Sequence, residues 1–305
     1  MNHPSAADGE TPGSSPVIYQ LSPHTVLRVS GPDRVRFLNG QVTQDVCRAT
    51  EEVAVPACVL NARGQLEAFC HIREDEESYL IDAPIELRAD LFERLDRYLI
   101  ADDVELTDES DDWHIAHLDR DTVNMLEHLP PKARWWTVPR LQAPHPEKSG
   151  IDLFSREPLA LPGLVEATRA EFRLAVTEAG LPQWGAELTP GLLPPEAGLD
   201  RYAISYEKGC YLGQEVISRM RTSGRTNRHL ICLTSPQSTL PGAILLHQDQ
   251  EAGVVTSVAA QSGSPGEEVA AIGFRRRKFA GELHFKIRNP SGQILPGTAT
   301  VRAEP

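Results

Sequence analysis

Short apolar segments joined by tight turns constrain the fold of this chain more than any other feature. Val53–Leu60 and Gln65–Ile72 have the residue types of strands, and Asn61–Gly64 between them predicts a hairpin turn with Gly64 at positive φ. Thr25–Ser30 alternates in the manner of another strand. The same reasoning predicts strands at Ser78–Ile81, Val104–Leu106 and Trp113–Leu118.

Helical periodicity is confined to a few segments. Glu86–Leu99 predicts a helix with one buried stripe, formed by Leu87, Leu91, Leu95 and Leu99. A shorter helix is expected after Gly31, with Asp33 or its neighbour as the cap and with apolar residues Val35, Phe37 and Leu38. Strands joined by hairpins, with few helices between them, favour an α+β fold over a parallel doubly wound sheet.

The second half of the chain begins with Leu141–Pro162, which is rich in Pro and polar residues and which we interpret as a loop or linker. A helix is predicted from about Leu164 to Ala179, followed by Gly180 in the usual C-terminal position. Leu188–Leu199 contains three Pro and two Gly and predicts an ordered irregular segment. After Ser235, a small β-barrel is expected from short strands at Ala243–His247, Gly253–Ala259, Val269–Phe274 and His284–Arg288.

Most of the net charge of −13 lies in one part of the 305-residue chain. Arg73–Asp112 contains 16 Asp or Glu and 4 Arg, a local net charge of −12. We interpret this acidic block as a solvated helix with its flanking turns. An acidic chain disfavours general nucleic-acid coating, because phosphate binding depends on Lys and Arg.

The residues that commonly bind metals are poorly grouped. None of the five cysteines forms a C-x-x-C pair with another, which argues against a zinc site and against a disulfide scaffold. His114 and His117 resemble a metal pair, but they have no obvious third ligand and we interpret them as structural.

The first residues and the overall hydropathy bear on location. Residues 1–16 are rich in Ser, Pro and Gly and are expected to form a disordered tail rather than a signal peptide. No apolar run reaches the roughly 18 residues that a membrane span needs. We therefore expect a cytoplasmic protein that does not bind membranes.

The most unusual segment is residues 207–219, Glu-Lys-Gly-Cys-Tyr-Leu-Gly-Gln-Glu-Val-Ile-Ser-Arg. Its glycines lead into a predicted helix, at whose entrance backbone N–H groups are free. Cys210 is accordingly either a small buried residue or a reactive thiol. Glu215 and Arg219 are one helical turn apart and can form an ion pair. This pair is either a surface ion pair or part of a functional site.

Between Val216 and Leu230 the chain contains four arginines and no acidic residue. The arginines are Arg219, Arg221, Arg225 and Arg228. In an acidic chain, their composition indicates an anion-facing patch. A solvated helix face is the alternative.

Lys208–Glu215, together with Arg219, resembles the signature of the YgfZ-type folate-binding proteins, which are relatives of the tetrahydrofolate-dependent glycine-cleavage T protein. Supporting blocks occur in matching order at Gly31–Arg34, Phe37–Val46, Asn61–Gln65, Gly180–Pro182, Gly185–Leu188 and Leu193–Glu196. The resemblance implies an α+β folate-binding body with ferredoxin-like elements at residues 17–235, which can contain two interleaved subdomains. A C-terminal β-barrel would follow at residues 236–305.

The resemblance also implies a folate pocket. Glu196 matches the family's Pro-x-Glu and would accept the adjacent N–H donors of the pterin edge, with an exposed loop acid as the alternative. The pocket walls would come from Tyr202, Tyr206 and Tyr211. The anionic tail would be bound by Arg219, Arg221 and Arg225. The signature would add Lys208, Gln214 and Glu215 to the ligand-binding residues.

The implied function is a tetrahydrofolate-binding accessory protein for the assembly or repair of iron–sulfur enzymes, including enzymes that modify tRNA. Cys210 would be its functional thiol, either reactive or a transient ligand beside the folate. No stable metal is expected, because a cluster needs several Cys ligands. Expected partners are folate and transient iron–sulfur client or assembly proteins, without stable nucleic acid, and we expect a monomer.

Two other functions stay open. A folate-dependent aminomethyl or one-carbon transferase would need an acid near the folate amine. Asp82-Ala83 resembles the Asn-Ala that opens the T-protein loop, but Asp90 is one residue too far from it and falls on a predicted helix. The T protein also lacks the Cys and Gln-Glu of this signature, so we expect binding without transfer. The third function is an adaptor whose arginine patch docks an acidic partner or RNA.

Overall fold

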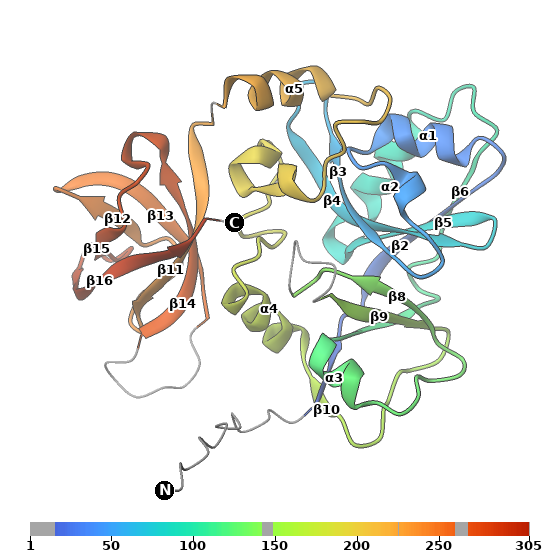
Figure 1. The fold of residues 1–305 in the computed structure, drawn as a ribbon, viewed down its shortest axis with the longest axis horizontal. Coiled ribbons are helices and arrows are strands. Elements are labelled where there is room, and N and C mark those ends of the chain that lie inside the picture. The colour runs from blue at the N-terminus through green and yellow to red at the C-terminus, as the bar shows by residue number, and fades with distance from the viewer. Residues whose placement is uncertain (1–15, 142–148, 225, 260–267, 305) are drawn as a thin grey trace, which may run out of the picture.

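Two mixed or antiparallel sheets form a body, and six further strands form a closed barrel (Figure 1). The structure is a computed structural model, and it describes residues 16–141, 149–224, 226–259 and 268–304. This architecture confirms the predicted α+β fold class with a C-terminal β-barrel. Among the helices described, none is long and apolar enough to span a membrane.

The first sheet is antiparallel, with the order β3-β4-β5-β2-β6. Its strands are β2 (His24–Ser30), β3 (Val55–Leu60), β4 (Leu66–Asp75), β5 (Ser78–Pro84) and β6 (Glu105–Asp108). Two helices cover one face, α1 (Arg34–Gln41) and α2 (Arg88–Asp96), each with a short 3₁₀ turn beside it, η1 (Val46–Arg48) and η2 (Ile85–Leu87). Phe37, Leu91 and Leu95 bury the two helices against the strands, which confirms the predicted apolar stripe.

The second sheet has the order β10-β1-β7-β9-β8, and only the β1–β10 pair is parallel. Its strands are β1 (Val17–Gln20), β7 (His114–Leu118), β8 (Arg134–Val138), β9 (Gly150–Ser155) and β10 (Val165–Ala167), with α3 (Arg120–Met125) packed beside them. Val26 and Leu80 of the first sheet share one core with Trp136 and Phe154 of the second. The two sheets are therefore packed together over a common core, and the chain passes between them twice, after β1 and after β6.

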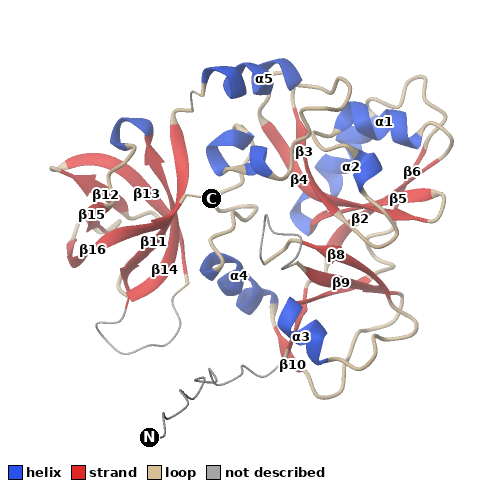
Figure 2. Ribbon diagram, viewed as in Figure 1, coloured by secondary structure: helices blue, strands red, loops and turns tan. Residues whose placement is uncertain are grey.

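The barrel has the strand order β11-β14-β13-β12-β15-β16. Its elements are β11 (Arg228–Pro236), β12 (Ile244–His247), β13 (Gln250–Val258), β14 (Glu268–Arg276), η6 (Arg277–Phe279), β15 (His284–Arg288) and β16 (Ile294–Ala303). The first barrel strand thus begins at Arg228, ahead of the boundary predicted near Ser235. Figure 2 shows α4 (Arg169–Glu178) and α5 (Gln214–Ser223) between the barrel and the sheets. The predicted irregular segment contains two 3₁₀ turns, η4 (Pro194–Ala197) and η5 (Leu199–Arg201).

The prediction of a loop at Leu141–Pro162 is wrong, because this range contains the buried strand β9. All six residues of β9 are buried, so the alternation of a half-exposed strand is absent. Asp152 at its centre is polar, but it is neutralised by distant arginines that local sequence does not reveal. Strand β8 also lies outside the predicted strands, although it is only partly buried.

Two helix starts also differ from prediction. The helix expected from Leu164 begins at Arg169, because Thr168 and Glu171 form a capping box. Asp33 precedes α1 but makes no side-chain cap; its carboxylate instead accepts from the backbone N of Asp103 and from Arg36.

The interpretation of the acidic block as a solvated helix and turns is only partly right. Asp82 is fully buried against Arg73, and Asp75 is buried against Arg28 and Arg134. These acids are internal partners of arginines from several strands. The exposed acids of α2, such as Asp90, fit the original interpretation.

Gly180 confirms the predicted C-terminal position and has a second role. It has φ +77°, and the bonds from its N to Thr177 O and from Leu181 N to Val176 O form a Schellman motif. A Cβ at Gly180 would also lie 2.4 Å from Cys232 Sγ on β11. The glycine therefore lets the end of α4 approach the barrel.

Gly180→Ala should lower the free energy of unfolding by about 2–4 kcal/mol. About 1–2 kcal/mol comes from the left-handed backbone, and the remainder from the overpacked contact with Cys232. The urea midpoint measures the loss. Gly163→Ala is the matched control, since Gly163 has φ +87° but open space around it, and should show only the backbone cost. An equal loss in both variants would contradict the packing role; adding Cys232→Ala should restore part of the Gly180→Ala loss.

Candidate functional site

The signature loop, residues 207–213, is anchored by Lys208, whose Nζ reaches the end of α1 and the residues just after it. The ammonium donates to Val42 O at 2.6 Å, to Asn39 O at 2.7 Å and to Gln44 O at 3.0 Å. It also lies 5.0 Å from the centre of the Tyr211 ring. Burial lowers the pKa of Lys208 to about 8, so the ammonium form still predominates at pH 7. The lysine is thus a structural clamp rather than a free ligand group.

Further bonds fix residues 43 and 44 to the segment that precedes the signature. Thr43 Oγ1 donates to Ala203 O at 2.6 Å, and Gln44 Nε2 donates to Tyr202 O at 2.8 Å. At the other end of the loop, Gly213 has φ +84°, and a Cβ there would lie 2.6 Å from Asn61 O. The hairpin turn predicted from sequence therefore supports the entrance of α5.

Cys210 is exposed at the surface of this clamped loop. Of the five free cysteines, Cys210 and Cys47 are exposed, whereas Cys58, Cys70 and Cys232 are buried. Burial raises the pKa of the Cys58 thiol to about 12, which makes that thiol unreactive. Of the two alternatives for Cys210, the structure excludes a buried packing role.

The remaining signature residues lie along α5. Gln214 is half-buried at its start. Arg219 donates to Glu215 at 2.6 Å, and the two side chains are 73% and 86% exposed. This is a solvated surface pair, whose contribution to stability is small.

An aromatic cavity lies where the first sheet, α4 and the segment after α4 meet. Its apolar walls include Phe69, Phe172, Trp184 and Tyr202. It encloses about 880 Å³ of non-atom space, part of it open to solvent. Arg169 and Arg173 line it from α4; Arg169 pairs with Glu86, while Arg173 has no ion pair among the residues described. Apolar walls with a few charged groups are typical of small-molecule sites.

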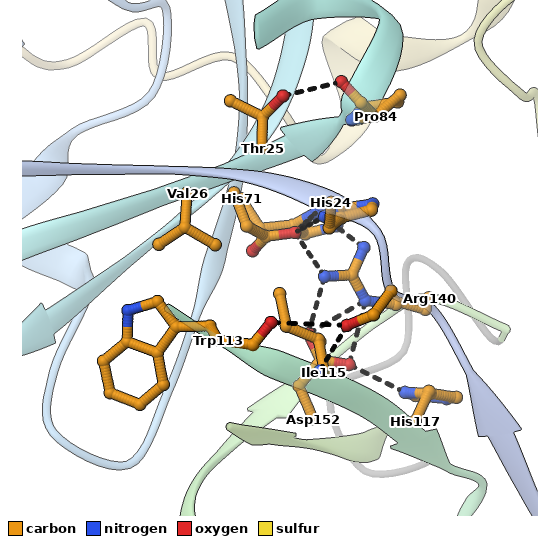
Figure 3. Close-up of polar contacts among 12 residues, drawn as sticks. His24, Thr25, Val26, His71, Pro84, Trp113, Ile115, His117, Arg140 and Asp152 are labelled. Atoms are coloured by element: carbon orange, nitrogen blue, oxygen red, sulfur yellow. Dashed lines mark hydrogen bonds and ion pairs between the residues drawn. The ribbon is translucent and has the colours of Figure 1, made fainter. Parts of the chain in front are cut away.

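The polar wall of the aromatic cavity is backed by a buried network of charges (Figure 3). Arg140 donates from Nε to Asp152 Oδ1 at 2.8 Å and from Nη2 to Asp82 Oδ2 at 2.5 Å. Arg73 donates to Asp82 and lies 3.4 Å from Asp152 Oδ2. His117 Nδ1 lies 3.0 Å from Asp152 Oδ1.

Burial and neighbouring charges set the protonation of this wall. Burial alone would raise the pKa of Asp152, but the Arg140 guanidinium and a hydrogen bond outweigh it and hold that pKa well below its usual range. Burial lowers the pKa of Arg73 to about 9, which leaves it charged at pH 7. Burial, followed by the charge of Arg140, lowers the pKa values of His24 and His71 well below 6.5. Both imidazoles are therefore neutral at pH 7.

A second cavity, the junction cavity, lies between η4, η5, α5 and the start of the barrel. Its lining includes Glu196, Asp200, Tyr206, Arg221 and His229, around about 740 Å³ of space that is partly open solvent. Glu196 is only 6% exposed and accepts from Arg228 Nε at 2.9 Å, so it is not the exposed loop acid of the alternative. The Arg221 guanidinium lies 3.9 Å from the centre of the Tyr206 ring.

The predicted ligand-binding residues are thus divided. Tyr202 lines the aromatic cavity, whereas Glu196, Tyr206 and Arg221 line the junction cavity, although Arg201 and Tyr202 are neighbours in the chain. Neither cavity is lined by the other predicted residues that the structure describes, which are Lys208, Cys210, Tyr211, Gln214, Glu215 and Arg219. Arg225 lies outside the described residues.

The residues considered for one-carbon transfer and for metal binding do not form sites either. Asp90 is exposed on α2 and lines neither cavity. His117 is fully buried against Asp152, while His114 is exposed, so the two do not form a metal pair. Within the described residues, no group of three or more His, Cys, Asp or Glu is placed to hold a metal ion.

Most residues that line the aromatic cavity are not among those predicted from sequence. His24 and His71 face it from β2 and β4, and Arg140 follows β8, which was not predicted. Two features of the sequence could have indicated this cavity. They are the polar residues within otherwise apolar strands and the resemblance of Asp82-Ala83 to the T-protein loop.

The overall architecture is that of a T-protein-like fold. The structure superposes on the glycine cleavage system aminomethyltransferase T from Bartonella henselae with a TM-score of 0.76, at 16% identity, over 95% of this chain and 86% of that one. No protein-family model matches the chain.

The sequence relatives are more specific. The chain is 26% identical, over 73% of its length and 73% of theirs, to "tRNA-modifying protein YgfZ" of Escherichia coli strain SMS-3-5 and of Shigella dysenteriae serotype 1. The chain is therefore similar to YgfZ proteins in sequence and to the T protein in fold, as the signature indicates.

Lys208→Met should release the signature loop. Removing the ammonium leaves buried carbonyls of residues 39–44 without a donor, which should lower the free energy of unfolding by about 2–3 kcal/mol. Chymotrypsin cleavage after the buried Tyr211 should become faster, as measured by mass spectrometry of timed digests. Lys132→Met, which removes a lysine 76% exposed, is the control and should change neither value. Unchanged cleavage in Lys208→Met would contradict the clamp.

Proposed function

We propose that this protein binds a reduced folate in the aromatic cavity and supports iron–sulfur enzymes that modify tRNA. The observation that carries the proposal is the combination, in one cavity, of aromatic walls, a polar inner wall and arginines on α4. The T-protein-like fold and the tRNA-modifying relatives give it its direction.

The parts of a folate correspond to the parts of this cavity. A pteridine ring and an aminobenzoyl ring need flat apolar contacts, which Phe69, Trp184 and Tyr202 supply. The glutamyl tail is anionic, and Arg173 lines the cavity, makes no ion pair with the described residues and donates from Nη2 to Trp184 O at 3.3 Å. Donors and acceptors for the polar ring edge are available at His24 and His71. The residues therefore fit the ligand that the fold implies.

The junction cavity provides the competing placement of the same ligand. There Glu196 would accept the pterin edge and Arg221 would bind the tail, as predicted from the family motif. Two features disfavour it: Glu196 is already paired with Arg228, and Arg221 covers the face of Tyr206. The two placements make opposite predictions for two arginines.

Arg173→Glu should weaken tetrahydrofolate binding by about 3- to 10-fold, because the charge near the tail is reversed at a partly solvated site. Isothermal titration calorimetry at pH 7.5 measures the affinity, and raising the salt concentration should shrink the difference. Arg221→Glu is the matched control in the junction cavity and should bind like the wild type. A loss confined to Arg221→Glu would move the site to the junction cavity, and absence of binding heat for the wild type would contradict folate binding altogether.

Cys210 is proposed to act on the client enzymes, because its thiol is exposed on a loop held in a fixed position by Lys208. It lies outside the lining of both cavities, so the thiol and the ligand pocket are separate elements of the structure. Transient contact with an iron–sulfur protein requires this kind of exposure.

In bacterial cells that lack their own YgfZ-type protein, Cys210→Ser should fail to restore the modified nucleosides that iron–sulfur enzymes make in tRNA. Mass spectrometry of digested total tRNA gives their levels, with immunoblots to verify equal protein amounts. Cys47→Ser, which removes the other exposed thiol, should restore them like the wild type. Full restoration by Cys210→Ser would contradict a role for this thiol.

A further inference from the structure

Two histidines on the wall of the aromatic cavity converge on one carboxylate oxygen. His24 on β2 and His71 on β4 flank Asp82 on the intervening strand β5. Their Nδ1 atoms lie 3.3 Å and 4.0 Å from Asp82 Oδ2. Figure 3 shows the two imidazoles next to Arg140. Their positions are therefore fixed by groups that are themselves buried.

The tautomer of His71 follows from Arg140. Arg140 Nη1 lies 3.2 Å from His71 Nδ1, and a guanidinium can only donate, so His71 Nδ1 is the acceptor. The proton of the neutral ring is then on Nε2. His71 thus presents an N–H donor at its other nitrogen.

The tautomer of His24 is opposite. His24 Nδ1 is buried without a hydrogen bond, and Asp82 Oδ2 lies 3.3 Å from it. A neutral imidazole places its proton on the nitrogen beside a carboxylate, because a lone pair there would be repelled. His24 Nε2 is then an acceptor.

The two Nε2 atoms have no hydrogen-bond partner among the described residues, although the side chains are only 10% and 9% exposed. Both residues line the aromatic cavity. The charges behind them cancel, because two arginines face two aspartates. The wall therefore offers one donor and one acceptor without net charge, which suits a neutral polar ring edge better than an anion.

We propose that His71 and His24 together recognise the cyclic-amide edge of a heterocycle bound in the aromatic cavity. The ring carbonyl would accept from His71 Nε2, and the adjacent ring N–H would donate to His24 Nε2. This deepens the proposed function, on which it rests: the 4-oxo group and N3–H of a pterin form such an edge. A guanine base carries the same cyclic-amide edge. An experiment must therefore distinguish a pterin ligand from a guanine ligand.

The direct test compares tetrahydrofolate with its 4-amino analogue, tetrahydroaminopterin, by calorimetry on the wild-type protein. The amino group exchanges donor for acceptor at both positions while the rest of the ligand is unchanged. Two mismatched hydrogen bonds should weaken binding by about 10- to 100-fold. Equal affinities would overturn the proposal while leaving folate binding intact.

Variants assign the effect to the histidines. His71→Phe should weaken tetrahydrofolate and reduce the preference over the 4-amino analogue to less than about threefold. His229→Phe in the junction cavity is the matched control and should retain the full preference. Loss of preference in His229→Phe alone would overturn the assignment. The wild-type comparison decides independently if His71→Phe does not fold.

Guanosine and its analogue 2,6-diaminopurine riboside, which has an amino group in place of the oxo group, test the second source. If tetrahydrofolate gives no heat but guanosine binds in preference to its analogue, the edge recognition stands and the proposed folate function fails. If neither tetrahydrofolate nor guanosine binds, both fail.

Discussion

Two arginines and two aspartates, buried between the two sheets, hold the body of this protein in its shape. Arg73, Asp82 and Asp152 are fully buried, and Arg140 nearly so. They come from β4, β5, β9 and the end of β8, and so connect elements far apart in the chain. Removing one member would strand an uncompensated charge, at a cost of about 3–5 kcal/mol.

The network also lies behind the polar wall of the neighbouring cavity. Arg140 and Asp82 contact His71 and His24, so the proposed recognition of a ring edge depends on them. Arg73 lies over the Phe154 ring at 4.2 Å, which anchors the network to the apolar core between the sheets. Stability and the proposed ligand recognition therefore depend on the same buried charges. The position of the acidic residues in the sequence says little about their role.

Local sequence predicted the elements whose causes are local. Such elements are the hairpin at Asn61–Gly64, the leucine stripe of α2 and the glycine after α4, each of which depends on residues close together in the sequence. Strand β9 could not be predicted in this way, because Asp152 is acceptable in a buried strand only when Arg73 and Arg140 reach it. The sheet order and the pairing of distant segments lie beyond such patterns.

The candidate site, too, has parts that local sequence predicts and parts that depend on distant residues. The signature identified the loop that carries Cys210, and its exposure and its clamp by Lys208 are consistent with a functional thiol. The sequence could not predict which way each residue of the 3₁₀ segment points. Long-range hydrogen bonds, such as the one from Gln44 to the Tyr202 carbonyl, determine these directions. As a result, Glu196 and Tyr202, expected in one pocket, line two different cavities.

A crystal structure of the protein with tetrahydrofolate would test directly whether the aromatic cavity binds a reduced folate. We expect electron density for the pteridine between Phe69, Trp184 and Tyr202, with its cyclic-amide edge toward His24 and His71 and its tail toward Arg173. Density for the pteridine beside Glu196 in the junction cavity, or no bound ligand at saturating concentration, would contradict it.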